Sequence, residues 1–138
     1  MIKLYGSASC NSCRKAQAWL EAQEVNFEAR DIIINPLAQQ DLADLLALTE
    51  TGTEEIIATR SKVYHKFTID FNELSLEELT EVITDNPGLL KRPIITDGVN
   101  LQIGYNEAEL QQFVAEAEES KQSTEILYYW ELEQESLV

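Results

Sequence analysis

The residues IKLYGSASCNSC at positions 2–13 place an apolar run, a short loop and a Cys-x-x-Cys in direct succession. The apolar run predicts a buried strand, and residues 11–23 carry apolar side chains three or four positions apart, as one face of a helix does. Cys10 and Cys13, the two cysteines of the chain, stand at the start of this helix, where unpaired N–H groups and the helix dipole favour a thiolate at Cys10. Strand, Cys-x-x-Cys and helix in this order are typical of a thioredoxin-like redox motif, whose sulfurs can form a disulfide.

Two other interpretations of Cys10 and Cys13 have less support. As small buried hydrophobic side chains they would have no reason to stand at a helix start. A zinc site usually has four ligands, and the chain offers two cysteines and the single His65. We therefore expect a redox-switch disulfide at Cys10 and Cys13, with no metal and no cofactor.

Outward from this motif, the pattern of apolar residues and caps alternates between strands and helices. The order is β–α–β, then helices, then a hairpin and a helix, which predicts an α/β fold: a thioredoxin-like mixed sheet with a helical insertion at roughly residues 36–85. We expect one domain, residues 1–117, followed by an acidic and mobile tail, residues 118–138. The signals are a strand at 25–34, a helix from Asn35-Pro36, a short helix at 54–59, a helix opened by the capping box Ser75-x-x-Glu78, a hairpin of 93–96 and 101–103 around Asp97-Gly98, and a helix capped by Asn106.

Composition limits the function. The formal net charge of −15 over 138 residues should repel a phosphate backbone, so the chain is not expected to bind DNA by itself. Five basic residues nevertheless gather in two short stretches, which allows either a local cationic face or a scatter of solvated charges; they are Arg60, Lys62, Lys66, Lys91 and Arg92. No apolar run approaches the ~20 residues of a membrane span and no signal peptide is evident, so we expect a cytoplasmic protein without a membrane partner.

Four blocks of sequence carry a resemblance to a known family. Residues 1 to about 114 resemble the Spx family of redox-sensing transcriptional regulators, which are relatives of glutaredoxin-coupled arsenate reductases. Cys-x-x-Cys alone would be weak evidence, but four blocks in the same order are specific. The blocks are Leu4-Tyr5 with residues 9–16, then residues 52–63, residues 86–95 and residues 101–107.

The resemblance implies a function as well as a thioredoxin-like fold. Spx-type regulators bind the C-terminal domain of the RNA polymerase α subunit and meet promoter DNA only jointly with the polymerase. A disulfide in the Cys-x-x-Cys switches them, and the ClpXP protease keeps them scarce. We therefore expect a global transcriptional regulator that responds to thiol stress, is a ClpXP substrate and is a monomer when free.

We expect partner binding at Gly52, Arg60, Lys62 and Arg92. The resemblance implies the role of Gly52, and positive charge makes Lys62, Lys91 and Arg92 the candidate contacts to DNA that the polymerase brings. Gly52 matches the family's glycine at the polymerase contact, although a glycine there is also the common end of a helix. Arg60 is the leading candidate to pair with a cysteine thiolate in the reduced protein. The proline after Arg92, Pro93, matches the proline that is cis in thioredoxin-like folds.

The alternative is an arsenate reductase-like or thioredoxin-like thiol oxidoreductase. In the reductases arginines hold the oxyanion, because a guanidinium offers a fork of donors to it. Arg60 and Arg92 are retained here, but the reductases carry a further arginine after the glycine that follows the hairpin, and this chain has Tyr105 after Gly104. We therefore predict a regulator and not an enzyme.

Overall fold

The computed structural model describes residues 1–114, and the tail predicted at 118–138 lies outside the described residues. A four-stranded sheet in the order β2-β1-β3-β4 forms its centre. β1 (Ile2–Gly6) runs parallel to β2 (Phe27–Asp31) and antiparallel to β3 (Ile94–Thr96), which pairs antiparallel with β4 (Leu101–Ile103). The predicted mixed sheet and its hairpin are confirmed.

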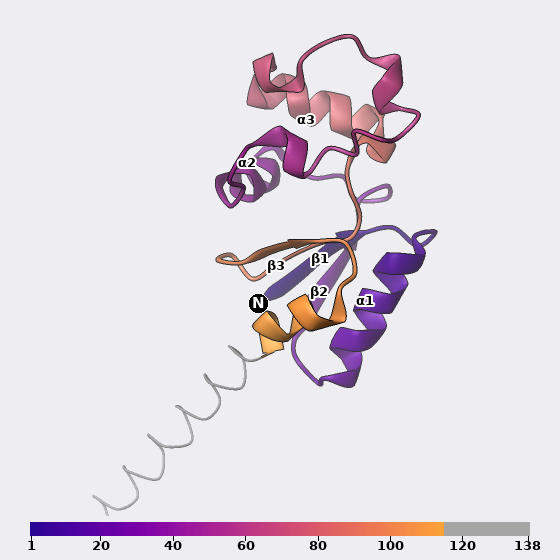
Figure 1. Cartoon of the computed structure of the whole chain (residues 1–138), viewed down its shortest axis with the longest axis vertical. Helices are drawn as coiled ribbons and strands as arrows, with labels where there is room; N and C mark the ends of the chain where they lie inside the picture. Colours follow the sequence, from indigo (N-terminus) through magenta and orange to yellow (C-terminus); the bar gives the residue numbers. More distant parts are fainter. Residues whose placement is uncertain (115–138) are drawn as a thin grey trace, which may run out of the picture.

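One face of the sheet is covered by α1 (Asn11–Ala22) and by the helical residues 107–114 (Figure 1). Alternation along β1 sends Ile2 and Leu4 to this face, where they pack in one cluster with Ala16 and Leu20 of α1. Ala16 and Leu20 have no exposed surface. The helix that carries the cysteines is therefore fixed to the central strand of the sheet.

The opposite face carries the helical insertion between β2 and β3 (Figure 1). Its main helices are α2 (Gln39–Ala47) and α3 (Leu76–Asp85), joined through short 3₁₀ turns at Thr53–Glu55, Tyr64–Lys66 and Phe71–Glu73. A further 3₁₀ turn, Pro87–Leu89, leads back to the sheet. These helices share a second apolar cluster with Tyr5 and Ile94, whose side chains project from β1 and β3 on this face.

Three predicted boundaries are wrong. β2 ends at Asp31, because the Asp31 carboxylate accepts the N–H of Ile33 at 2.9 Å and turns the chain. α2 begins at Gln39 instead of Asn35-Pro36: Arg30 donates to the carbonyl oxygens of residues 35 and 36, and Asp41 accepts the N–H of residue 38 at 2.9 Å. These contacts between β2 and the following loop make the helix begin later than predicted, and they cannot be recognised from the local sequence.

The third wrong boundary is the short helix expected at 54–59. Only the 3₁₀ turn Thr53–Glu55 forms, and beyond it Ile57 makes an antiparallel bridge to Leu90. By contrast, the capping box is confirmed, since Ser75 Oγ accepts the Glu78 N–H at 3.1 Å and the Glu78 carboxylate accepts the Ser75 N–H at 3.0 Å. Among residues 1–114, no helix has both the length and the apolar character that a membrane crossing requires.

Candidate functional site

The two cysteines occupy the first turn of α1, as predicted. Cys10 is the N-cap residue, and its Sγ accepts the backbone N–H of Cys13 at 3.2 Å. Cys10 is half-buried whereas Cys13 is only 4% exposed, and both are free thiols. An oxidant in solution therefore meets Cys10 first, with Cys13 directly behind it.

The Cys13 thiol is held protonated at neutral pH. Burial, followed by its hydrogen bond to Cys10, raises the pKa of Cys13 to about 12, and the backbone of Ser7 and the charge of Arg92 oppose this shift only in part. Since the thiolate is the reactive form of cysteine, Cys13 is a poor nucleophile until the environment of its sulfur changes. Cys13 is therefore both buried and protected from ionisation.

Ser7 connects the cysteine loop to the cis-proline loop. Its carbonyl accepts the N–H of Cys10 at 3.2 Å, and its Oγ accepts a hydrogen bond from Arg92 Nη1 at 2.7 Å. The Arg92–Pro93 peptide bond is cis, as the resemblance implied. Arg92, rather than the expected Arg60, is the guanidinium whose charge acts on Cys13.

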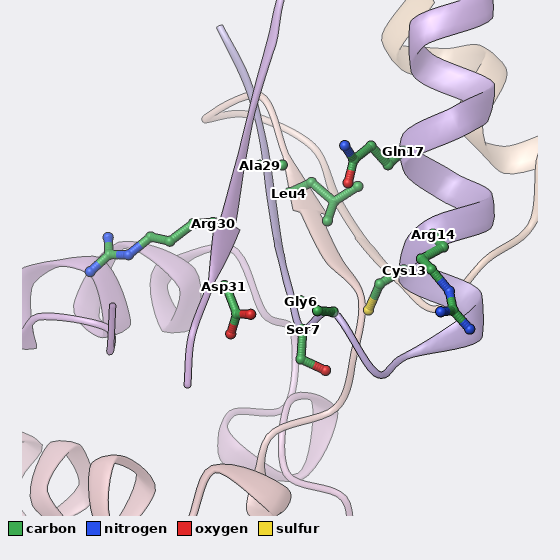
Figure 2. A pocket seen from close by; sticks show the side chains of 10 residues that line it. Leu4, Gly6, Ser7, Cys13, Arg14, Gln17, Ala29, Arg30 and Asp31 are labelled. Atoms are coloured by element: carbon green, nitrogen blue, oxygen red, sulfur yellow. The ribbon is translucent and has the colours of Figure 1, made fainter. Parts of the chain in front are cut away.

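A pocket of about 210 Å³ opens beside the Cys13 thiol, between α1 and β2 (Figure 2). The Cys13 sulfur points from α1 towards Gly6 and Ser7, while Arg30 extends from β2 away from it. The walls are mixed in character, and they are formed by Leu4, Gly6, Ser7, Ala8, Cys13, Arg14, Gln17, Ala29, Arg30 and Asp31. Cys10 does not line this pocket, so the two sulfurs face different surroundings.

Gly52 occupies a backbone conformation that side chains rarely adopt. With φ +101° and ψ −142°, it is the residue before the 3₁₀ turn Thr53–Glu55. A Cβ built there would lie 3.5 Å from Asn72 Oδ1, which is ordinary contact, so the backbone angle rather than crowding selects glycine. The positive φ expected of Gly52 is present, but the helix-end interpretation is wrong: α2 ends at Ala47 with Leu48 as its C-cap, and Gly52 instead precedes a 3₁₀ turn.

Arg60 and Lys62 are exposed just after this turn, and Arg60 shares a second pocket with Ala58, Thr59 and Lys91. We call residues 52–62, where the sequence leads us to expect partner contact, the docking segment. Backbone hydrogen bonds fasten it to the loop before β3: the Ala58 N–H donates to the Leu89 carbonyl at 2.6 Å, and the Lys91 N–H donates to the Ile56 carbonyl at 2.8 Å. Arg60 and Lys91 thus come together, whereas Arg92 turns to Ser7.

Two residues of the site were not found by sequence reasoning, which assigned Gly6 and Ser7 only to a connecting loop. Both are buried, and a Cβ on Gly6 would lie 2.6 Å from Cys13 Sγ. The available signal was a glycine at the end of the strand before the Cys-x-x-Cys. That this glycine packs against Cys13 could not be predicted from the sequence.

Neither a metal cluster nor a complete arginine cradle is found in the described part of the chain. Residues 1–114 contain no group of three or more His, Cys, Asp and Glu side chains placed to hold a metal ion. Gly104 donates its N–H to the Pro93 carbonyl at 2.8 Å, which sets Tyr105, a half-buried side chain, where the reductases are expected to carry an arginine.

Comparison with known proteins places these features in a family. The model of the ArsC family matches residues 5–113. The global transcriptional regulator Spx of Enterococcus faecalis is 51% identical over 114 residues, covering 83% of this chain and 86% of that protein. The global transcriptional regulator Spx of Streptococcus agalactiae is 51% identical over 127 residues, covering 90% of this chain and 93% of that protein.

A solved structure gives the same fold. The crystal structure of a possible arsenate reductase from Streptococcus mutans superposes with a TM-score of 0.63 at 28% identity, covering 77% of this chain and 92% of that chain. The thioredoxin-like ArsC fold expected from the sequence is thereby confirmed. The fold is shared by proteins named as regulators and as reductases, so it does not by itself decide between them.

Proposed function

The chain belongs to the ArsC family and, within it, to the Spx-type global transcriptional regulators, and from this premise we propose that it binds the C-terminal domain of the RNA polymerase α subunit under the control of a Cys10–Cys13 disulfide. In the proposed switch, both thiols lose a proton and two electrons pass to an oxidant such as a disulfide or a hydroperoxide. The product is the Cys10–Cys13 bond, and no substrate is turned over.

The observation that carries the proposal is the unequal pair of sulfurs at the start of α1. The accessible Cys10 would react first with the oxidant, which removes the Cys10 thiol that helps to raise the pKa of Cys13. Cys13, three residues away on the same turn, would then resolve the adduct as a disulfide. One sulfur at the half-buried cap of the helix and a second one in the core suit a disulfide that forms once on oxidation and is then kept, without turnover of a substrate.

A continuous set of contacts supports coupling to the docking segment. Ser7 bonds both to the backbone of Cys10 and to the side chain of Arg92, and the neighbouring Lys91 bonds to the carbonyl of Ile56. A disulfide that moves the 7–10 loop would therefore act on the segment of Gly52 through backbone partners. Coupling of this kind is typically worth 1–3 kcal/mol, or about 5- to 150-fold in affinity.

In this proposal the partner surface consists of Gly52, Arg60 and Lys62 of the docking segment. Arg92 adds to it on the side of the cysteine loop, where it bonds to Ser7. Lys62 and Arg60 are exposed and free to meet promoter phosphates once the polymerase domain has brought DNA close. The protein would act in the cytoplasm, as a monomer when free and as a substrate of ClpXP. The enzyme alternative requires an oxyanion cradle, which Tyr105 leaves incomplete.

The direct test is a binding isotherm with the isolated α C-terminal domain, using the reduced and the oxidised protein. We expect stoichiometric binding, with affinities in the two redox forms that differ by at least about fivefold. Cys10→Ala and Cys13→Ala proteins should bind with a single affinity under both conditions. Equal affinity of the parent in both forms would remove the switch, and multiple turnover of arsenate with glutathione and glutaredoxin would favour the enzyme.

A matched pair at residue 52 separates the contact from the backbone strain. Gly52→Ala and Gly52→Arg force the same unfavourable φ of +101° on a side chain, so both should lose similar stability, about 1–3 kcal/mol. Only the arginine is large enough to hold two surfaces apart. If Gly52 lies in the contact, Gly52→Arg weakens binding far more than Gly52→Ala; equal binding by the two variants would place the contact elsewhere.

A further inference from the structure

Gly6, the last residue of β1, lies directly against the Cys13 thiol. A Cβ at this position would stand 2.6 Å from Cys13 Sγ, closer than real Cβ atoms come to a neighbour, and 3.0 Å from Cys13 Cβ, which is unusually tight. Gly6 is not among the glycines with positive φ, so its backbone would accept any residue. The room taken by the sulfur is therefore the reason that a glycine fits here.

The two redox states of a cysteine pair differ in the distance between the sulfurs. Two thiols keep their sulfurs at non-bonded distance, whereas the S–S bond of a disulfide is about 2.05 Å long. Cys10 lies on the solvent side of the pair and its Sγ is held by the Cys13 N–H, so the extra separation is taken up on the inner side, against Gly6. In the proposed switch the pair contracts on oxidation by movement of Cys13 Sγ away from β1 and towards Cys10.

We propose that Gly6 is a positioning residue for the redox switch: it accommodates the Cys13 sulfur in the dithiol state and so sets the equilibrium between dithiol and disulfide. This inference rests on the proposed Cys10–Cys13 switch and names the residue that tunes it. A side chain at position 6 crowds the dithiol and leaves the disulfide unaffected, and it therefore makes the disulfide harder to reduce.

The experiment is a redox titration of the full chain in glutathione buffers. The reaction exchanges two protein thiols and one oxidised glutathione for the intramolecular disulfide and two reduced glutathione molecules. The ratio of the two protein forms is measured by alkylation and mass spectrometry. Gly6→Ala is expected to raise the equilibrium constant for disulfide formation about tenfold, which for a two-electron couple lowers the midpoint potential by about 30 mV.

The matched control is Gly88→Ala. Gly88 also lacks a positive φ, and a Cβ there would lie 3.2 Å from the side chain of Val63, which is not next to the cysteines in sequence. Its equilibrium constant should equal that of the parent. An unchanged constant in Gly6→Ala overturns the inference. So does a decrease, because the displaced sulfur would then have moved into the neighbouring pocket instead of towards Cys10.

A second measurement covers the case in which Gly6→Ala folds poorly. The cost of Gly6→Ala in the free energy of unfolding of the reduced protein is compared in the parent and in the Cys13→Ala background. If the sulfur is the obstacle, the cost is smaller without it; equal costs overturn the inference. Should the parent form no Cys10–Cys13 disulfide in any buffer, the proposed switch itself fails, a result distinct from a parent disulfide that Gly6→Ala leaves unshifted.

Discussion

The helix that carries the cysteines and the docking segment 52–62 are held in the fold in very different ways. α1 has twelve residues, and its inner face, including Ala16 and Leu20, is wholly buried against the sheet. The docking segment has only a three-residue 3₁₀ turn, and it is fixed through two buried isoleucines and a few backbone hydrogen bonds to residues 89–91. The helix that carries the cysteines is thus held along its length by buried side chains, whereas the docking segment is held at a few positions, above all Ile56 and Ile57.

This difference explains how a change at two sulfurs could matter at a distance. Movement of a core helix such as α1 would cost many apolar contacts, whereas a shift of the docking segment needs only the rearrangement of its attachments. The same contrast predicts which substitutions should damage the whole fold and which should act locally.

The largest effect is expected at the attachment itself. Ile57 is 1% exposed and forms the bridge to Leu90, so Ile57→Ala should lower the free energy of unfolding by about 2–5 kcal/mol. Urea unfolding of the reduced protein measures it. Ile34→Ala, at a side chain that is 83% exposed, is the control and should change stability by less than about 0.5 kcal/mol. A similarly small loss at Ile57 would mean that the segment is not fixed through this residue.

A smaller effect is expected at the sensor in alkaline solution. The pKa of Cys13 is about 12 in the folded protein against an ordinary value of 9.0, so the native state retains the proton that the unfolded chain loses. The protonated Cys13 thiol makes its full contribution to the free energy of unfolding below pH 9, and this contribution falls as the pH rises towards 12. Between pH 9 and 10.5 the loss should approach about 2 kcal/mol.

The comparison that isolates this thiol is the reduced parent against Cys13→Ala, each unfolded in urea at pH 8, 9 and 10.5. Burial also raises the pKa of Tyr5, but that titration is present in both proteins and cancels in the difference. The gap between the two stabilities should narrow, or reverse, as the pH rises. A constant gap would show that the Cys13 sulfur is not protected from ionisation.

The smallest effect is expected at the capping box of α3, whose two residues are exposed and belong to neither region. Ser75→Ala removes the acceptor for the Glu78 N–H and should cost about 1 kcal/mol. Hydrogen bonds from Ser75 lower the pKa of Glu78, so the contribution of this carboxylate is present above its ordinary pKa and is lost as the pH falls through its lowered value. The main donor to Glu78 is the Ser75 backbone N–H, which alanine keeps, so both proteins should lose this contribution in acid and the difference between their stabilities should change little.

Thr84→Ala, an exposed position in the same helix, is the control for the cap and should alter stability by no more than about 0.5 kcal/mol. Neither substitution should affect redox titration or partner binding. A change in the redox titration would mean that the start of α3 acts on the cysteines, and a change in partner binding would mean that it acts on the docking segment.

Features that depend on neighbouring residues were predictable from the chain. The strand before the Cys-x-x-Cys, the helix after it, the capping box of α3 and the hairpin around Asp97-Gly98 all follow from periodicity, caps and turn residues. The end of β2 and the start of α2 were not, because Arg30 and Asp41 form a 3.0 Å ion pair across the intervening loop. The helix expected at 54–59 was lost to a bridge with a residue more than thirty positions away.

The sequence by itself determined that two sulfurs stand at the first turn of a helix beside a strand, since that arrangement needs only the local pattern. Only the tertiary structure decided that one sulfur is buried on Gly6, that Arg92 rather than Arg60 faces the cysteine loop, and that Ile57 meets Leu90. The physical reason is that burial and close approach depend on which distant segments pack together. The Ser7–Arg92 hydrogen bond joins residues 85 positions apart, and no local pattern encodes such a pair.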